Sequence, residues 1–260
     1  MTERLFFTHV LLTAERLGYV GSHAAAALST GRAGTIAIIT PFVDRLAFQR
    51  MLAGVENVAQ RTGVALLLYC TGDPSDPHPR PPYRTLAQRV DGFIVLSLSA
   101  ASPDVADLLK LGMPVAMFGA RLLGASSVQI DDRGGAASAV RHLINLGHRR
   151  IGVIYGKDAS DPAVLEHERH LGVRDAFEAA RLPYPTDLIV PGRYTMADGA
   201  TAMNTLLDRD EPPTAVFAFS DEMAYGAIQA MRRRGIRPGH DIALIGYDGH
   251  EMSSVLELST

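Results

Sequence analysis

The sequence predicts an α/β fold in which two small lobes are each built on a parallel sheet. Short apolar runs alternate with longer amphipathic runs along most of the 260 residues. The short runs are apolar at consecutive positions, which is typical of strands buried on both faces of a parallel sheet. Repeated strand–helix–strand order implies right-handed crossovers within such a sheet.

The strands are expected at nine short apolar segments. The second of them contains Cys70, the one cysteine of the chain, and a free cysteine in such a run is expected to be a buried thiol. A single cysteine also excludes a disulfide framework within one chain. In order, the segments are Thr35–Ile39, Val64–Cys70, Phe93–Leu96, Val115–Phe118, Ser127–Ile130, Ile151–Tyr155, Asp187–Val190, Ala215–Phe219 and Ile242–Tyr247.

Helices are expected between these strands. In the first helix, Phe48, Met51, Leu52 and Val55 recur at helical spacing, and Gly63 can end the helix as a left-handed C-terminal cap. The remaining helices are expected over Ala136–Leu146, Val164–Ala180, Met196–Leu207 and Met223–Met231.

Two segments interrupt this alternation. Residues 73–82 carry five prolines, which predicts an irregular surface loop. Before Thr35, a helical stretch over Thr8–Leu17 is followed by a short helix over Ala24–Leu28 with glycines on both sides, which indicates a linker. Two aspartates and two glycines at 131–135 mark the midpoint. We therefore expect residues 1–34 to be a helical segment with a linker, and residues 35–130 and 131–260 to be two lobes rather than one nine-stranded sheet.

Composition narrows the possible partners and the location. The formal net charge is −3, so the chain as a whole offers no basic field that could hold nucleic acid by counterion release. No apolar stretch approaches the roughly 18 residues that a bilayer span requires. The apolar start of the chain contains Glu3, His9 and Glu15, which are unlike a signal peptide. These features predict a cytoplasmic protein without a membrane partner.

The motifs of common catalytic sites are missing from the sequence. There is no G-x-S-x-G elbow and no G-x-G-x-x-G after a strand. The nearest phosphate loop, Gly152–Asp158, has the wrong spacing and an aspartate where a magnesium-binding hydroxyl is needed. His167 and His170 are three residues apart, which does not fit the i, i+4 zinc geometry. We expect no catalytic residue, no metal site and no cofactor.

Polar residues instead gather where the predicted strands end. Ligands of open α/β sheets bind beyond the carboxyl ends of the strands. Ser220 and Asp221 can equally cap the following helix, as can Asp132, and Arg169 can equally belong to a solvated charged face. As a group the residues suit binding of a small polar ligand better than chemistry on it. They are Asp248, Ser220 with Asp221, Asp131 with Asp132, Arg193 with Tyr194, and Thr40 followed by Phe48.

Several stretches in combination resemble the lactose-repressor/galactose-repressor (LacI/GalR) family of bacterial transcription regulators. The resemblance covers nearly the whole chain. It implies two lobes of the periplasmic-binding-protein type I kind with a sugar-like effector in the cleft between them. The stretches are Ala14–Tyr19, Ser22–Leu28, Thr30–Arg32, Val128–Asp132, His142–Ile151, Arg169–Gly172, Ser220–Ala227 and Asp241–Asp248.

The resemblance also implies roles for particular residues. It assigns effector binding to Thr40 and Phe48 in the first lobe and to Arg169, Tyr194, Ser220 and Asp248 in the second. The position of Asp131 at a strand end adds this residue to the expected effector-binding residues. The resemblance places Ala25 and Leu28 in a hinge helix that forms on DNA, where a leucine at the position of Leu28 enters the minor groove and kinks the duplex. The family's usual arginine in this helix is replaced by Ala26.

The resemblance further implies differences at both ends. The family's helix-turn-helix precedes the stretch that begins at Ala14, and Met1–Thr8 do not resemble that motif. The family also continues beyond the position of Thr260. We expect this chain alone to bind operator DNA poorly, and the complete protein to be a homodimer. The alternative function is a stand-alone solute-binding protein of a transport system, which would need export.

Overall fold

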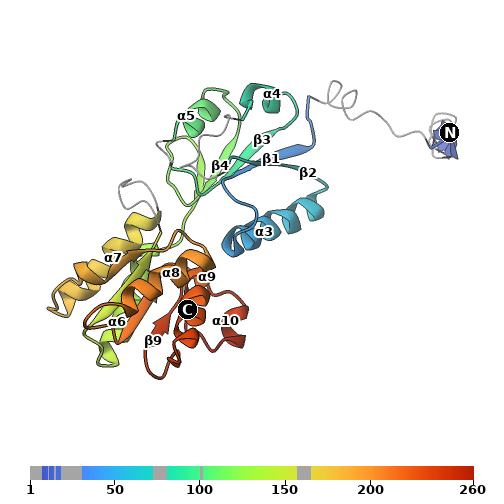
Figure 1. The fold of residues 1–260 in the computed structure, drawn as a ribbon. Coiled ribbons are helices and arrows are strands. Elements are labelled where there is room, and N and C mark those ends of the chain that lie inside the picture. The colour runs from blue at the N-terminus through green and yellow to red at the C-terminus, as the bar shows by residue number, and fades with distance from the viewer. Residues whose placement is uncertain are drawn as a thin grey trace.

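The computed structural model describes residues 8–10, 12–14, 16–18, 31–72, 81–99, 102–156 and 165–260. Within them lie two parallel sheets, each flanked by helices (Figure 1). The two-lobed α/β architecture expected from the sequence is therefore confirmed. The hinge positions Ala25 and Leu28, and most of the proline-rich segment 73–82, lie outside the described residues.

The first sheet has five strands in the order β2-β1-β3-β4-β5, and every neighbouring pair is parallel. Figure 1 shows α3 on one side of this sheet and α4 and α5 on the other. Its elements are β1 Thr35–Thr40, α3 Leu46–Thr62, β2 Ala65–Cys70, α4 Tyr83–Ala87, β3 Gly92–Leu96, α5 Pro103–Leu109, β4 Val115–Phe118 and β5 Ser126–Val128.

The second sheet has four strands in the order β7-β6-β8-β9, also all parallel. Helices α6 and α7 pack against each other on one side of it, and α8 and α9 on the other (Figure 1). The elements are α6 Asp132–Asn145, β6 Ile151–Tyr155, α7 Leu165–Ala179, a 3-10 turn Thr186–Leu188, β7 Ile189–Pro191, α8 Met196–Leu207, β8 Ala215–Ala218, α9 Asp221–Arg233, β9 Ala243–Ile245 and α10 Met252–Val255.

Two glycines allow α8 and α9 to pack closely. Gly199 of α8 faces the backbone of Met223, and Gly226 of α9 faces the carbonyl oxygen of Met196. A Cβ at either position would collide with that backbone, so the short interhelical distance depends on both glycines. The close packing of the two helices holds the start of α9 against the hydrophobic core of the second lobe.

Burial differs between central and edge strands. Central β8 is fully buried, as its consecutive apolar residues predict, whereas β2 is partly exposed along its length. The prediction of a buried thiol at Cys70 is wrong, since this residue is exposed. The physical reason is the place of β2 at the edge of the first sheet, where one side of the strand has no neighbouring strand.

The first lobe also touches the second through the start of α3. The side chain of Leu46 packs against the hydrophobic core of the second lobe. One turn further along α3, Nη1 of Arg50 donates a hydrogen bond to the carbonyl oxygen of Gly249, at 2.7 Å. These contacts bring the first turns of α3 beside the loop that follows β9.

Candidate functional site

The polar residues of the second lobe come from four different elements. Asp248 follows β9, Ser220 follows β8, Tyr194 follows β7, and Arg169 lies near the start of α7, the helix after β6. All four therefore lie toward the carboxyl ends of the parallel strands. This is the edge at which open α/β sheets bind their ligands.

Arg169 is the buried centre of this cluster. Its Nε donates to Oδ1 of Asp132 at 2.7 Å, and its Nη1 donates to the carbonyl oxygen of Phe219. Its Cζ lies 3.9 Å from the centroid of the Tyr247 ring, within range of a cation–π interaction. The alternative of a solvated charged face is wrong for Arg169, because its side chain is only 8% exposed.

Asp248 completes the charged group. Its Oδ1 lies 3.9 Å from Nη2 of Arg169. Burial raises the pKa of Asp248 to about 7, and Asp221 and Glu222 add to the rise, while Arg169 opposes it. A carboxyl group whose pKa is about 7 is present in both its protonated and its ionised form near neutral pH. It can therefore donate a hydrogen bond to a polar ligand or accept one from it.

The backbone is strained at three positions around this group. Asp248 has φ 112°, and the consecutive residues Arg193 and Tyr194 have φ 47° and 58°. Residues other than glycine rarely occupy this region, and such strain is concentrated at functional sites. Tyr194 is also near enough to Arg169 to interact with it electrostatically. The strained turn therefore presents an aromatic ring beside the buried guanidinium.

Ser220 and Asp131 are both helix caps in this structure. Oγ of Ser220 accepts from the backbone N–H of Met223 at 3.2 Å, and Oδ1 of Asp131 accepts from that of Gly134 at 2.8 Å. Both side chains can still form hydrogen bonds with a ligand. The Ser220 hydroxyl keeps its proton to donate, and the exposed Asp131 keeps a second carboxylate oxygen to accept.

The neighbouring aspartates do not act as caps. Asp132 is 2% exposed and pairs with Arg169 instead of capping α6. Asp221 accepts from the backbone of His250 at 2.7 Å and from the hydroxyls of Ser253 and Thr260 at 3.0 and 2.5 Å. It thereby ties the last segment of the chain to the start of α9.

The first lobe contributes an apolar face. Thr40 is fully buried at the end of β1, and its hydroxyl donates to the carbonyl oxygen of Phe42 at 2.9 Å. Phe48, on the first turn of α3, is half-buried and meets Phe42 edge to face at 5.8 Å between ring centroids. Because Arg50 joins the same helix to Gly249, Phe48 belongs to the part of the first lobe that lies near the Asp248 loop.

Sequence reasoning did not assign Tyr247, Arg50 or Glu222 to the site. Tyr247 immediately precedes Asp248 in the same strand-end motif, so the assignment of Asp248 could have pointed to Tyr247 as well. Arg50 reaches the second lobe at Gly249, and Glu222 adds to the rise in the pKa of Asp248. Nothing local in the sequence marks either relationship. Within the described residues, no group of three His, Cys, Asp or Glu side chains is placed to hold a metal ion, and no helix is long and apolar enough to cross a membrane.

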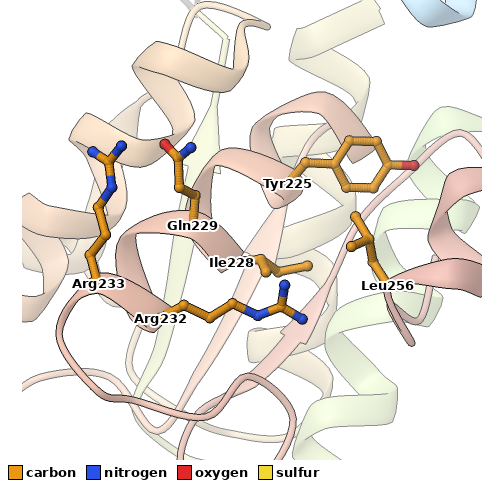
Figure 2. Close-up of a pocket in the computed structure, with 6 residues that line it drawn as sticks. All are labelled: Tyr225, Ile228, Gln229, Arg232, Arg233 and Leu256. Atoms are coloured by element: carbon orange, nitrogen blue, oxygen red, sulfur yellow. The ribbon is translucent and has the colours of Figure 1, made fainter.

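A separate groove of about 420 Å³ lies along α9. Figure 2 shows side chains from successive turns of this helix beside Leu256, which follows α10. The groove is lined by the middle and end of α9, whereas the Arg169–Asp248 group lies at the start of that helix. The lining residues are Tyr225, Ile228, Gln229, Arg232, Arg233 and Leu256.

Two parallel-sheet lobes with polar groups at their strand ends define the periplasmic-binding-protein class of fold. Residues 140–260 match the family model described as "Periplasmic binding protein-like domain". Catabolite control protein A of Priestia megaterium is 31% identical over 251 residues, which is 95% of this chain and 74% of that protein.

Solved structures agree with the sequence comparison. A CelR–cellobiose complex matches with a TM-score of 0.72 and 31% identity, over 94% of this chain and 74% of that one. A LacI-family regulator from Enterococcus faecium with bound ribose matches with a TM-score of 0.73 and 27% identity, over 85% of this chain and 80% of that one. The chain belongs to the LacI family of transcriptional regulators. Its relatives are regulators, which favours this function over a solute-binding protein of a transport system.

Proposed function

We propose that the chain binds a small polar effector, a sugar or a related metabolite, between its two lobes. The observation that carries the proposal is the pairing of a buried guanidinium, Arg169, with the carboxylate of Asp248, whose side chain is 22% exposed, at the strand ends of the second lobe. The start of α3 from the first lobe lies against the same loop. The proposed effector-binding residues are Thr40, Phe48, Asp131, Arg169, Tyr194, Ser220 and Asp248.

The chemistry of these groups matches a polyol. An ionised Asp248 can accept hydrogen bonds from two hydroxyls, and Arg169 can donate a fork to ligand oxygens. The rings of Tyr194 and Phe48 can pack against the apolar face of a sugar. The sugars named for two structural relatives, cellobiose and ribose, support this ligand class.

In the proposed mechanism, the effector shifts the lobes toward a closed arrangement. Closure changes the geometry presented to operator DNA, so effector and operator are coupled through one two-state element. Residues 35–130 and 131–260 form the two effector-binding lobes, and Ala25 and Leu28 belong to the DNA-binding hinge. The regulator acts as a homodimer in the cytoplasm and catalyses no reaction, as its relationship to transcription regulators supports.

Isothermal titration with cellobiose, ribose and a panel of other sugars and nucleosides tests this proposal. We expect at least one ligand to bind, and Asp248→Ala to weaken it at least tenfold, since a buried hydrogen bond to a charged group contributes about 1.5–3 kcal/mol. Asp208→Ala, which removes an exposed carboxylate at the end of α8, is the matched control and should bind normally. A panel in which no compound binds or raises the melting temperature would contradict the proposal.

A further inference from the structure

Asp248 lies in a strained turn, residues 247–250, whose backbone must be held by other parts of the chain. Its φ is 112°, and the next residue, Gly249, has φ 67°. A residue other than glycine keeps such a conformation only where the surrounding structure fixes it. In this conformation Oδ1 of Asp248 lies 3.9 Å from Nη2 of Arg169. The groups that hold the turn therefore also decide where this carboxylate points.

Three backbone groups of the strained turn are hydrogen-bonded to Asp221 or to Thr260. The carbonyl oxygen of Tyr247 accepts from the backbone N–H of Asp221 at 2.8 Å. The backbone N–H of His250 donates to Oδ2 of Asp221 at 2.7 Å. The backbone N–H of Gly249 donates to Oγ1 of Thr260 at 3.2 Å. The turn is thus held on both sides of its strained residue.

The two holding side chains are also joined to each other. Oγ1 of Thr260 donates to Oδ1 of Asp221 at 2.5 Å, so one hydroxyl serves both the carboxylate and the turn. Asp221 is 1% exposed, and Gly246 makes room for it, since a Cβ at Gly246 would collide with Oδ1 of Asp221. Because both oxygens of this buried carboxylate accept hydrogen bonds, its orientation is fixed.

Helix capping does not explain these contacts of Asp221. The cap of α9 is Ser220, whose Oγ accepts from the backbone N–H of Met223. The side chain of Asp221 instead accepts hydrogen bonds from the segment that follows β9, at His250, Ser253 and Thr260. The role of Asp221 therefore lies in the segment that carries Asp248.

We propose that Asp221 and Thr260 are positioning residues of the effector site, which hold the strained turn so that Asp248 faces Arg169 in the absence of ligand. The proposal rests on the proposed function, because that function makes Asp248 an effector-binding residue. Without these hydrogen bonds the backbone at Asp248 relaxes toward negative φ, and its carboxylate turns away from the guanidinium. A carboxylate that is already in place loses less conformational freedom when a ligand binds.

The first measurement reports the conformation of Asp248 without any ligand. The three-bond coupling between its amide and Hα protons, measured by NMR, depends on φ and separates a φ near 112° from an extended backbone. Thr260→Val removes the hydroxyl at constant charge and similar size, and we expect the coupling to move to the extended value. Asp221→Ala, shown by circular dichroism to be folded, should do the same.

Two further variants separate the hydroxyl from other effects of substitution. Thr260→Ser keeps the hydroxyl, so it should keep the coupling of the unchanged protein. Thr205→Val makes the matched change at an exposed hydroxyl of α8 and should also keep it. If Thr260→Val gives the same coupling as Thr260→Ser and the unchanged protein, the proposal is overturned.

The second measurement is the affinity for cellobiose and for ribose by isothermal titration. For whichever sugar binds, Thr260→Val should weaken binding by about three- to tenfold, the usual effect of losing a neutral hydrogen bond, and Thr260→Ser should restore it. A changed coupling with unchanged affinity would also overturn the proposal. If neither sugar binds, the coupling still decides whether Asp221 and Thr260 hold Asp248, whereas the sugar panel decides the proposed function separately.

Discussion

Arg169 and Asp132 form an ion pair, 2.7 Å between Nε and Oδ1, in which both side chains are almost fully buried. The pair lies beneath the proposed effector site, and Tyr247 covers the face of the guanidinium. The fork of Arg169 is therefore oriented before any ligand arrives. A fixed guanidinium loses less conformational freedom on binding than a mobile one.

Removing one member of this pair should destabilise the protein strongly. Asp132→Ala leaves the Arg169 charge buried beside a cavity, and we expect the free energy of unfolding to fall by about 3–5 kcal/mol. Urea denaturation at pH 7 measures the change. Asp175→Ala breaks the exposed ion pair with Arg133 and should leave the urea midpoint close to that of the unchanged protein. Equal midpoints for the two variants would contradict the structural role of Asp132.

Two glycine-to-alanine substitutions should have opposite effects on the stability of the protein. In Gly226→Ala the new methyl group meets the backbone of Met196, so α8 and α9 must separate, at a cost of about 2–4 kcal/mol. Gly54 lies inside α3 with open space around it, and Gly54→Ala should stabilise by about 0.4–1 kcal/mol. Thermal denaturation compares both. A Gly226→Ala protein as stable as Gly54→Ala would show that the two helices are not closely packed.

The exposed thiol should be chemically accessible. Cys70 lies at the end of the edge strand β2, and its Sγ donates only a weak hydrogen bond to the carbonyl oxygen of Pro41, at 3.1 Å. We expect one equivalent of an aromatic disulfide reagent to react with the folded protein at a rate similar to that in denaturant, within about tenfold. If the thiol instead reacts only after the protein unfolds, Cys70 is buried, as the sequence predicted.

Local patterns in the sequence were sufficient for most of the fold and part of the site. Gly63 ends α3 in the left-handed conformation, as its position after an amphipathic run predicted. Ser220 and Asp248 lie at the carboxyl ends of β8 and β9, because buried parallel strands place whatever follows them at one edge. These features depend on residues close together in the chain.

The remaining features depend on partners that are distant in the sequence. Asp131 and Asp132 are equally suited to cap α6, and only the position of Arg169 in the folded chain decides which of them is buried. Arg50 of the first lobe donates to the carbonyl oxygen of Gly249, which lies 199 positions later in the sequence. The order of the strands also depends on distant partners. The sequence of β2 is as apolar as that of a central strand, yet β2 lies at the edge of its sheet.

The stability of the protein should depend on the protonation of Asp248. Burial raises its pKa in the folded protein to about 7, from an ordinary value of 3.8. Between these two values the folded state therefore binds more protons than the unfolded state, so Asp248 contributes a stability that falls as the pH rises from about 4 to about 7. Above pH 7 the carboxylate of Asp248 is ionised, and the full cost of its partial desolvation is present.

Asp248→Asn removes this penalty, because the amide stays neutral at every pH. We expect it to match the unchanged protein near pH 4 and to be more stable by about 1–3 kcal/mol at pH 8, because the pKa rises from 3.8 to about 7 and solvent around the partly exposed side chain screens part of the penalty. Urea denaturation across this range gives the difference between the two proteins, in which other titrating groups cancel. A difference for Asp248→Asn that stays constant from pH 4 to pH 8 would mean that Asp248 has the same pKa in the folded and unfolded protein.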